Sequence, residues 1–284
     1  MFQSPLPWRN LRKTRSTVRV GSKLQIKYYV EPDPAALARR AVEYLVEMAS
    51  EAVEAQGRAR IAISGGSTPK AAFELLADPN HPWRSRMPWE MLDVYWVDER
   101  CVPPDDAESN YRMTREALLD HVPLRPEQIH RMEGELEPGA AAARYEQELR
   151  SGFRIDGAQS PRFDLVQLGI GNDGHTASLF PHTEAIHETN RLVVANRVPQ
   201  KDASRITLTW PVINRARSVF FLVSGEEKAA VMKEVLTGPH DPERLPSQLI
   251  WPCSGILTLI LDKAAAALLP PIDEDGCGVL ERDR

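Results

Sequence analysis

Short apolar runs alternate along the chain with longer segments in which apolar residues recur every three or four positions. The short runs are rich in β-branched and aromatic residues and indicate strands, whereas the longer spacing indicates amphipathic helices. This alternation predicts an α/β fold with a mostly parallel sheet flanked by helices. The expected strands are residues 24–30, 60–63, 92–97, 163–168, 192–195, 206–209, 219–223 and 256–261, and the expected helices are residues 34–55, 69–77, 110–119, 139–149, 226–236 and 263–269.

Composition places the chain among globular proteins. Its 284 residues are 42% hydrophobic and 26% charged, which is enough to bury a large core in a single domain. No apolar stretch approaches the roughly 20 residues that cross a bilayer, and no secretory leader is visible. We therefore expect a cytoplasmic protein without a membrane partner. Cys101, Cys253 and Cys277 lack the close spacing of a zinc site or a disulfide framework.

Charge is spread unevenly along the chain. Residues 1–30 carry seven basic residues and no acidic one, so the net charge of −5 leaves −12 on the other 254 residues. We interpret residues 1–27 as a basic, disordered extension, because Pro5 and Pro7 argue against a transit helix. The acidic remainder argues against a nucleic-acid partner. The domain is then expected over residues 28–269, with a loose C-terminal tail over residues 270–284.

The run LGIGNDGHTASLFP, residues 168–181, follows an expected strand and concentrates unusual chemistry in one turn. Glycines before a helix let backbone N–H groups approach an anionic ligand, and Gly171 lies in such a position. His175 is expected at the mouth of a short helix that Pro181 ends, where an imidazole can move protons near neutral pH. Together with Asp173, this turn predicts a reaction site.

The same turn also satisfies the G-x-G-x-x-G pattern of dinucleotide-binding proteins. That pattern requires a long helix after the turn and an acidic residue at the end of the next strand. Here Pro181 shortens the helix, and the next expected strand is followed by Asn196. The context therefore argues against a nicotinamide or flavin cofactor.

A second glycine turn follows the expected strand at residues 60–63. Thr68 suits a helix N-cap and Pro69 suits the first helical position, so the N–H groups that precede them are free to bind an anion. The spacing differs from that of a P-loop, and an ordinary strand-to-helix turn is the alternative. The residues of this predicted phosphate cradle are Gly65, Gly66, Ser67 and Thr68.

Charged residues follow two further strands. Asp98 and Arg100 come directly after a buried-looking run and are candidates for ligand contacts, whereas Glu99 between them is expected to be solvated or salt-bridged. Lys228 lies near the start of an expected helix, where its charge opposes the helix dipole, and a ligand role accounts for it. Ligands bind beyond the carboxyl ends of strands in open α/β sheets, so these turns are predicted to share one crevice.

The residues themselves limit the chemistry. There is no G-x-S-x-G motif for a serine nucleophile, and Asp173 and His175 lack a third metal ligand at convincing spacing. We therefore expect no metal site. A histidine in a glycine turn that faces a crevice favours acid/base catalysis, here on a phosphorylated small molecule.

Six segments in order along residues 28–269 resemble the 6-phosphogluconolactonase family: AISGGSTP (62–69), VDER (97–100), SNYRM (109–113), LGIGNDGHTASLFP (168–181), RITLTWPVINRA (205–216) and GEEKA (225–229). The resemblance implies hydrolysis of 6-phospho-D-glucono-1,5-lactone to 6-phosphogluconate, the second step of the oxidative pentose phosphate pathway. It also implies a single-domain, Rossmann-like α/β fold, shared with aminosugar-phosphate isomerases. It implies a sugar phosphate as partner and no metal or organic cofactor.

Carried onto this chain, the resemblance makes His175 the general base that takes a proton from the attacking water. Asp173 would orient His175 or the sugar hydroxyls. Three cations would hold the phosphate together with the glycine turn. The implied substrate- and phosphate-binding residues are Gly65, Gly66, Ser67, Thr68, Asp98, Arg100, Asn110, Gly171, Arg205 and Lys228.

Two other functions fit parts of the sequence. The related glucosamine-6-phosphate deaminases have similar turns, but they place a glutamate five residues after the histidine, where this chain has Phe180. Asp98 matches the proton-shuttling aspartate of that class, but the residues that follow it, Glu99 and Arg100, resemble those of the lactonases. A non-catalytic sugar-phosphate sensor is the third possibility, and the intact Asp173 and His175 argue against it.

Overall fold

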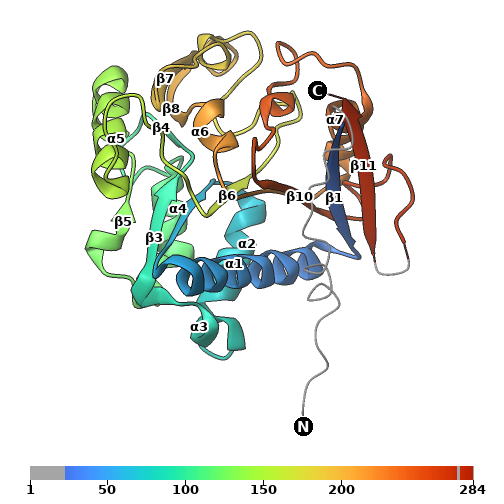
Figure 1. Cartoon of the computed structure of the whole chain (residues 1–284), viewed down its shortest axis with the longest axis horizontal. Coiled ribbons are helices and arrows are strands. Elements are labelled where there is room, and N and C mark those ends of the chain that lie inside the picture. The colour runs from blue at the N-terminus through green and yellow to red at the C-terminus, as the bar shows by residue number, and fades with distance from the viewer. Residues whose placement is uncertain (1–22, 274–275, 284) are drawn as a thin grey trace.

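The computed structural model describes residues 23–273 and 276–283 (Figure 1). Their strands form a main sheet in the order β11-β1-β10-β9-β6-β2-β3-β5 and a small antiparallel sheet in the order β4-β8-β7. The strands are β1 (Lys23–Glu31), β2 (Ala59–Ile63), β3 (Leu92–Trp96), β4 (Asp98–Arg100), β5 (Ile129–His130), β6 (Leu165–Leu168), β7 (Val193–Val198), β8 (Ala203–Leu208), β9 (Ser218–Val223), β10 (Ile256–Asp262) and β11 (Cys277–Asp283).

Helices cover both faces of the main sheet. The helices are α1 (Pro34–Gln56), α2 (Ser67–Ala77), α3 (Pro82–Arg86), α4 (Asn110–Ala117), α5 (Pro138–Phe153), α6 (Trp210–Asn214) and α7 (Ala229–Thr237). Figure 1 shows α1, α2 and α3 below the sheet and α5, α6, α7 and the small sheet above it, and the buried residues divide into two matching cores. The longest helix, α1, begins at Asp33, whose side chain accepts the N–H of Ala36, and ends at Gly57 in the left-handed region.

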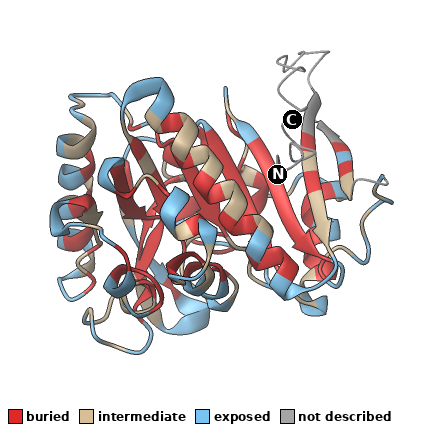
Figure 2. Cartoon of the chain, turned by 90° about the horizontal axis from the view of Figure 1, so that it is seen from below, coloured by how far each residue is buried: buried red, intermediate tan, exposed pale blue. Residues whose placement is uncertain are grey.

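The central strands are buried on both sides. All five residues of β3 are buried, with Val94 and Trp96 in the core between α1 and the sheet and Tyr95 in the core on the opposite face. Figure 2 shows these buried strands behind α1. Parallel strands covered on both faces need apolar residues at successive positions, which explains why their sequences form continuous apolar runs.

The order of the strands reverses between β2 and β6. From β2 the chain proceeds outward to β3 and β5, whereas from β6 it proceeds to β9 and β10 in the other direction. A crevice forms at such a switch point, beyond the carboxyl ends of the strands. Ser64, just after β2, donates its N–H and its hydroxyl to Oε1 of Gln167 in β6 at 2.9 and 3.0 Å, and so joins the two strand ends.

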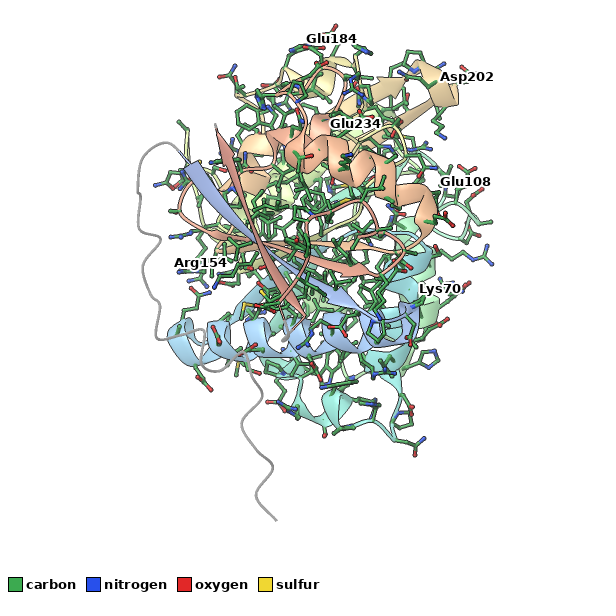
Figure 3. The ribbon with its side chains drawn as sticks, turned by 90° about the vertical axis from the view of Figure 1, so that its right-hand side faces the viewer. Lys70, Glu108, Arg154, Glu184, Asp202 and Glu234 are labelled. Atoms are coloured by element: carbon green, nitrogen blue, oxygen red, sulfur yellow. The ribbon has the colours of Figure 1, made fainter. Side chains whose placement is uncertain are left out.

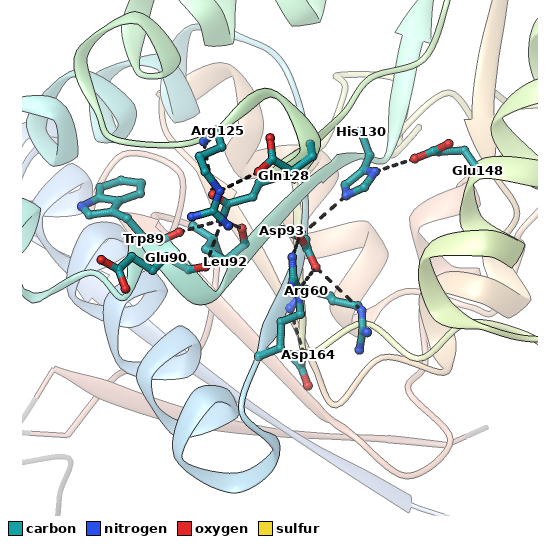
Figure 4. Close-up of polar contacts among 12 residues, drawn as sticks. Arg60, Trp89, Glu90, Leu92, Asp93, Arg125, Gln128, His130, Glu148 and Asp164 are labelled. Carbon is teal, nitrogen blue, oxygen red and sulfur yellow. Dashed lines mark hydrogen bonds and ion pairs between the residues drawn. The ribbon is translucent and has the colours of Figure 1, made fainter.

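An ion-pair network occupies the opposite edge of the sheet (Figure 4). The buried Asp93 of β3 pairs with Arg58, and Nε2 of His130 lies 3.7 Å from its carboxylate. Nδ1 of His130 lies 2.6 Å from Oε1 of Glu148. Burial alone would lower the pKa of His130, but the hydrogen bonds and charges of Asp93 and Glu148 outweigh it and raise that pKa.

The predicted fold class is confirmed, because the main sheet is parallel from β1 to β5 and helices flank it. Every expected strand is present with small shifts of its ends. The strands β4, β5 and β11 and the short helices α3 and α6 were not predicted. Strands of two or three residues carry too little alternation to be recognised, and α6 has a proline in its first turn and only five residues.

The expected ends of the domain need correction. Residues 23–27, assigned to the basic extension, belong to β1, where Ile26 is fully buried. Residues 277–283, assigned to a loose tail, form β11, which pairs antiparallel with β1. The ring of Tyr28 fills the space beside Gly278, whose Cβ would lie 2.1 Å from that ring. Residues 1–22 lie outside the described part of the chain, so the proposed disordered extension stays a prediction there.

The helix expected over residues 263–269 is wrong. This segment forms hydrogen-bonded turns, in which Ala265 donates to the side chain of Asp262 and Ala266 to the carbonyl of Asp262. Alanines favour helix, but Pro270 and Pro271 have no N–H to donate to the carbonyls of this segment, so the pattern does not continue beyond turns.

Candidate functional site

Four turns lie at the carboxyl edge of the main sheet. They follow β3, β2, β6 and β9, which are consecutive neighbours in the sheet. In Figure 3, Lys70 and Glu108 lie toward this edge and Arg154 lies at the opposite one. The strand order thus confirms that the four turns chosen from the sequence leave adjacent parallel strands at the same edge.

His175 and Asp173 form a hydrogen-bonded pair in the turn after β6. Nδ1 of His175 lies 2.5 Å from Oδ1 of Asp173, which also accepts the N–H of His175 at 3.2 Å. Burial alone would raise the pKa of Asp173, but the hydrogen bond and charge of His175 outweigh it and lower that pKa. The ionised carboxylate accepts the Nδ1 proton, which leaves Nε2 of the neutral ring as its basic nitrogen.

Two glycines give this turn its shape. A Cβ on Gly171 would lie 2.0 Å from Nδ1 of His175 and 2.5 Å from Oδ1 of Asp173, so only glycine leaves room for the pair. Gly174 has φ +79°, and a Cβ there would meet Leu245 at 2.6 Å. The carbonyl of Gly174 accepts the N–H and the hydroxyl of Ser247 at 2.9 and 2.8 Å, which anchors the turn from behind.

The ring of His175 stacks on Phe180, with centroids 4.0 Å apart and planes inclined by 19°. The segment between them is one tight turn at Ala177 and Ser178, closed by a bridge between Thr176 and Leu179, so the short helix expected after His175 is wrong. The reason is local, because Ala177 adopts φ +47°, a left-handed conformation that a right-handed helix cannot contain.

The turn after β2 leads into α2 earlier than expected. Gly66, with φ +114°, is the N-cap and α2 begins at Ser67, so the N-cap assigned to Thr68 is wrong. Proline is tolerated anywhere in the first helical turn, which explains why Pro69 does not fix the start. The side chain of Ser67 is exposed at this edge. A Cβ on Gly65 would lie 1.8 Å from Oδ1 of Asn110, so this glycine lets α4 approach β2.

Asp98 is buried and bound to other protein groups. It is only 7% exposed, and Nδ2 of Asn110 donates to its backbone carbonyl at 3.0 Å. The hydroxyl of Ser178 donates to its Oδ2 at 2.6 Å. The predicted site residues Asp98 and Asn110 therefore lie together, and Ser178, which the sequence did not single out, joins them to the histidine turn.

Glu99 is the clearest error of the sequence-based interpretation. It is 2% exposed, and its carboxylate accepts the N–H groups of Arg100, Asn110 and Tyr111 at 2.7–2.8 Å and the hydroxyl of Ser109 at 3.1 Å. Burial raises the pKa of Glu99, although these backbone donors lower it. The available signal was the helix start at Ser109, because the free N–H groups of a helix N-terminus attract a carboxylate.

Arg100 and Arg205 face each other across the small sheet. They are directly paired in the register of β4 and β8, although like charges at such positions repel. Burial lowers the pKa of Arg205, and the charge of Arg100 lowers it further. The side chain of Arg100 donates to the carbonyl of Glu108. Two cations held this close to each other suit an anionic ligand between them.

Lys228 reaches the histidine turn from the turn after β9. It ends a 3-10 turn, Glu226–Lys228, just before α7, and its Nζ lies 2.6 Å from Oδ1 of Asn172. The helix expected from residue 226 therefore begins as a 3-10 turn. The contact brings a third cation beside the pair of His175 and Asp173.

Among the described residues, no group of three or more His, Cys, Asp and Glu side chains is arranged to hold a metal ion. In the same part of the chain, no helix combines the length and the apolar character needed to span a membrane.

A family model described as glucosamine-6-phosphate isomerases/6-phosphogluconolactonase matches residues 32–259. The chain belongs to this family. Among curated members, the 6-phosphogluconolactonase of Nostoc sp. is 42% identical over 242 residues, which cover 84% of this chain and 97% of that protein. The family membership agrees with the resemblance seen in the sequence motifs.

Solved structures of the family superpose on the fold described above. The crystal structure of devB protein has a TM-score of 0.78 at 35% identity and covers 86% of this chain and 100% of its own. The 6-phosphogluconolactonase from Trypanosoma cruzi has a TM-score of 0.74 at 32% identity and covers 86% of this chain and 97% of its own. The family model, which matches residues 32–259, spans the turns that carry the candidate site.

Proposed function

We propose that this protein is an enzyme that hydrolyses 6-phospho-D-glucono-1,5-lactone to 6-phospho-D-gluconate, in the second step of the oxidative pentose phosphate pathway. The observation that carries the proposal is the pair of His175 and Asp173 in a glycine turn at the switch point of the sheet. Membership of the family and the relatives named 6-phosphogluconolactonase support it.

The reaction proceeds by general-base activation of water. Nε2 of His175 takes a proton from a water molecule as that water attacks the lactone carbonyl, while Asp173 holds the ring through Nδ1 and stabilises its positive charge. The carbonyl oxygen becomes negatively charged and needs hydrogen-bond donors. The N–H groups of Gly171, Gly174 and His175 are already used within the turn, so these donors come from other groups.

The phosphate of the substrate carries a charge of about −2 at neutral pH. In this proposal Arg100 and Arg205 bind it from the small sheet and Lys228 binds it from the start of α7. The N-terminus of α2, with Gly66 and Ser67, supplies backbone N–H groups. Binding the remote phosphate positions the lactone carbonyl against His175.

We further propose that the enzyme acts in the cytoplasm, on a small sugar phosphate and without a nucleic-acid or membrane partner. Cys101 and Cys253 are free thiols in the structure, which agrees with a reducing compartment. The acidic surface that remains outside the basic N-terminal residues agrees with a small-molecule rather than a nucleic-acid ligand.

Deamination of glucosamine 6-phosphate is the alternative that the family membership leaves open. Ring opening and proton transfer between carbons need an additional acid/base group. Phe180 occupies the place beside His175 where that group would have to act, and a phenyl ring cannot relay a proton.

The decisive experiment measures both reactions in one preparation. Freshly generated 6-phosphogluconolactone should be hydrolysed rapidly, after spontaneous hydrolysis is subtracted, whereas glucosamine 6-phosphate should release no ammonia. Glucono-1,5-lactone without a phosphate should be a poor substrate, because it lacks the contacts that position the carbonyl. Ammonia release at a rate comparable with lactone turnover, or equal efficiency on the two lactones, would contradict the proposal.

A further inference from the structure

Ser178 is bound by all three strands of the small sheet. Its hydroxyl donates to Oδ2 of Asp98 in β4 at 2.6 Å, and its N–H donates to Oγ1 of Thr207 in β8 at 3.3 Å. Its carbonyl accepts Nδ2 of Asn196 in β7 at 2.9 Å. Each polar group of this one residue thus has a partner on a different strand, and the serine is only 1% exposed.

The partners of Ser178 are themselves fixed. Asp98 and Thr207 are paired in the register of β4 and β8, and Nδ2 of Asn110 contacts the carboxylate of Asp98 from α4 at 3.4 Å. Asn196 also donates to the hydroxyl of Thr183 at 3.0 Å. All these side chains are buried, and hydrogen bonds are stronger in such surroundings than in water. The network is therefore rigid.

The chain between His175 and Ser178 carries strain. Ala177 adopts φ +47°, a left-handed conformation that is unfavourable for alanine and persists only where the surroundings impose it. The three contacts of Ser178 impose it, since they fix the next residue. Two residues further on, Phe180 presents its ring to His175. The contacts of Ser178 thus determine the position of the whole segment that shapes the histidine site.

We propose that Ser178 is a positioning residue that fixes His175 relative to the strands that carry Arg100 and Arg205. Those arginines lie on β4 and β8, the same strands that hold the hydroxyl and the N–H of Ser178. Asp98 then acts through Ser178 rather than by contact with substrate. This inference rests on the proposed function, in which the arginines bind the phosphate and His175 activates water.

The proposed reaction depends on the distance between His175 and the phosphate site. The phosphate and the lactone carbonyl are separate parts of one substrate, so phosphate binding helps catalysis only if the base lies at a fixed distance from the phosphate site. A displacement of about 1 Å can lower a rate by about 10²-fold. Loosening Ser178 should therefore reduce kcat while the cations themselves, and with them KM, change little.

The test compares Ser178→Ala with Ser218→Ala. Ser218 is equally buried and its hydroxyl is 2.9 Å from that of Tyr44, but it begins β9 at the opposite edge of the sheet. Both variants lose one buried hydrogen bond and should lose similar thermal stability. Ser178→Ala should lower kcat by about tenfold or more, whereas Ser218→Ala should stay within twofold of the wild type.

Comparing the two lactones as substrates of Ser178→Ala distinguishes a positioning role from a general loss of stability. In Ser178→Ala the advantage of the phosphorylated lactone over the unphosphorylated lactone should shrink, because phosphate binding no longer places the carbonyl correctly. A purely structural loss lowers both rates equally. Ser178→Ala with at least half of the wild-type kcat, an unchanged ratio of the two lactones, or an equal loss of kcat in Ser218→Ala would overturn the inference.

A measurement without substrate keeps the inference testable if the proposed reaction fails. Because its ring is stacked on that of His175 at 4.0 Å, Phe180 should shift the NMR signal of the His175 Cε1 proton upfield. Ser178→Ala should move this signal toward its random-coil value, whereas Ser218→Ala should leave it unchanged, and identical spectra would refute the positioning role. If Ser178→Ala does not fold, Ser178→Cys, whose thiol is a weaker donor, should give smaller changes of the same kind.

Discussion

At the scale of single residues, the site depends on how closely side chains approach the backbone. Gly171 leaves the space that His175 and Asp173 occupy, and Gly65 leaves the space for Asn110. The hydrogen bond from His175 to Asp173 then fixes which ring nitrogen is basic. The position of the imidazole is thus set by one carboxylate and by the space that Gly171 leaves beside it.

Replacing His175 by alanine should lower kcat by roughly 10²–10⁴-fold, because the attacking water loses its base. His187→Ala is the matched control, since His187 is exposed and pairs with Glu243 at 3.2 Å. Lactone turnover and thermal unfolding should be measured for both variants. More than a tenth of wild-type turnover in His175→Ala would contradict the role as base.

The sequence led to His175 and Asp173, which the structure pairs, and to two glycine turns, which it places at the same edge of the sheet. Their roles in catalysis and binding stay predictions. The sequence was not sufficient for Glu99 or Ser178. A charged residue after a strand is usually solvated, and a serine in a turn usually has no special role. Only the tertiary contacts of Glu99 and Ser178 set them apart from such ordinary residues. Their partners lie on other elements and are adjacent only in the folded chain.

At the scale of elements, the start of α4 is bound to β4 by one buried carboxylate. Glu99 accepts the N–H groups of Asn110 and Tyr111, and Ser109 is the N-cap of the helix. The raised pKa of Glu99 reflects the burial of its carboxylate, which its hydrogen bonds only partly offset. The position of α4 relative to β4 is therefore fixed, and the burial of the Glu99 carboxylate is its energetic cost.

Glu99→Gln should lower the free energy of unfolding by about 1–3 kcal/mol, because an amide has one acceptor oxygen and would place its own donors against the helix N–H groups. Glu137→Gln is the control. Glu137 caps α5 by accepting the N–H of Ala140 at 2.8 Å, but it is exposed, so water replaces the lost acceptor. Thermal unfolding of both variants measures the difference, and equal shifts would show that burial does not matter here.

The network around His130 predicts a dependence of stability on pH. Its folded-state pKa is raised above the ordinary value of 6.5, so the charged ring stabilises the fold fully below pH 6.5, and this stabilisation is lost as pH rises through the raised pKa. His130→Gln should abolish this decline, whereas His121→Gln, at an exposed site, should retain it. Urea unfolding between pH 6 and 9 tests this, and an unchanged decline in His130→Gln would exclude the network as its source.

The ends of an element could be predicted from the sequence where its hydrophobic pattern was long. The 23-residue α1 was predicted within one residue of its end, whereas the seven alanine-rich residues after β10 were wrongly assigned to a helix. Long amphipathic segments carry several turns of periodic information, and short ones carry one turn that neighbouring elements can override. The three-residue β4 exists because β8 lies beside it.

At the scale of the whole molecule, the two ends of the described chain close one side of the main sheet. β1 is paired with β10 on one side and with β11 on the other, and Figure 1 shows β1 and β11 side by side. The sequence predicted the central parallel strands, because buried runs are apolar. It did not predict β11, because one glycine and three charged residues are typical of a tail. In the structure Tyr28 covers that glycine, Gly278.

Adjacent residues of β11 should differ sharply in their contribution to stability. Leu280 is 8% exposed and packs in the core, whereas Val279 is 54% exposed. Leu280→Ala should lower the free energy of unfolding by roughly 2–4 kcal/mol, and Val279→Ala should change it by less than about 0.5 kcal/mol. Chemical denaturation measures both. Equally small effects would restore the interpretation of this segment as a loose tail.

The facing arginines of the small sheet link the proposed affinity of the enzyme for phosphate to its folding stability. Arg100 and Arg205 repel each other, and in the proposed function a bound phosphate dianion offsets that repulsion. Any ligand that binds the folded chain alone also shifts its unfolding equilibrium, and here it removes an existing repulsion as well. If the proposed phosphate site is right, a substitution that neutralises either arginine would stabilise the free enzyme and weaken phosphate binding, so that at these two positions selection trades stability against recognition.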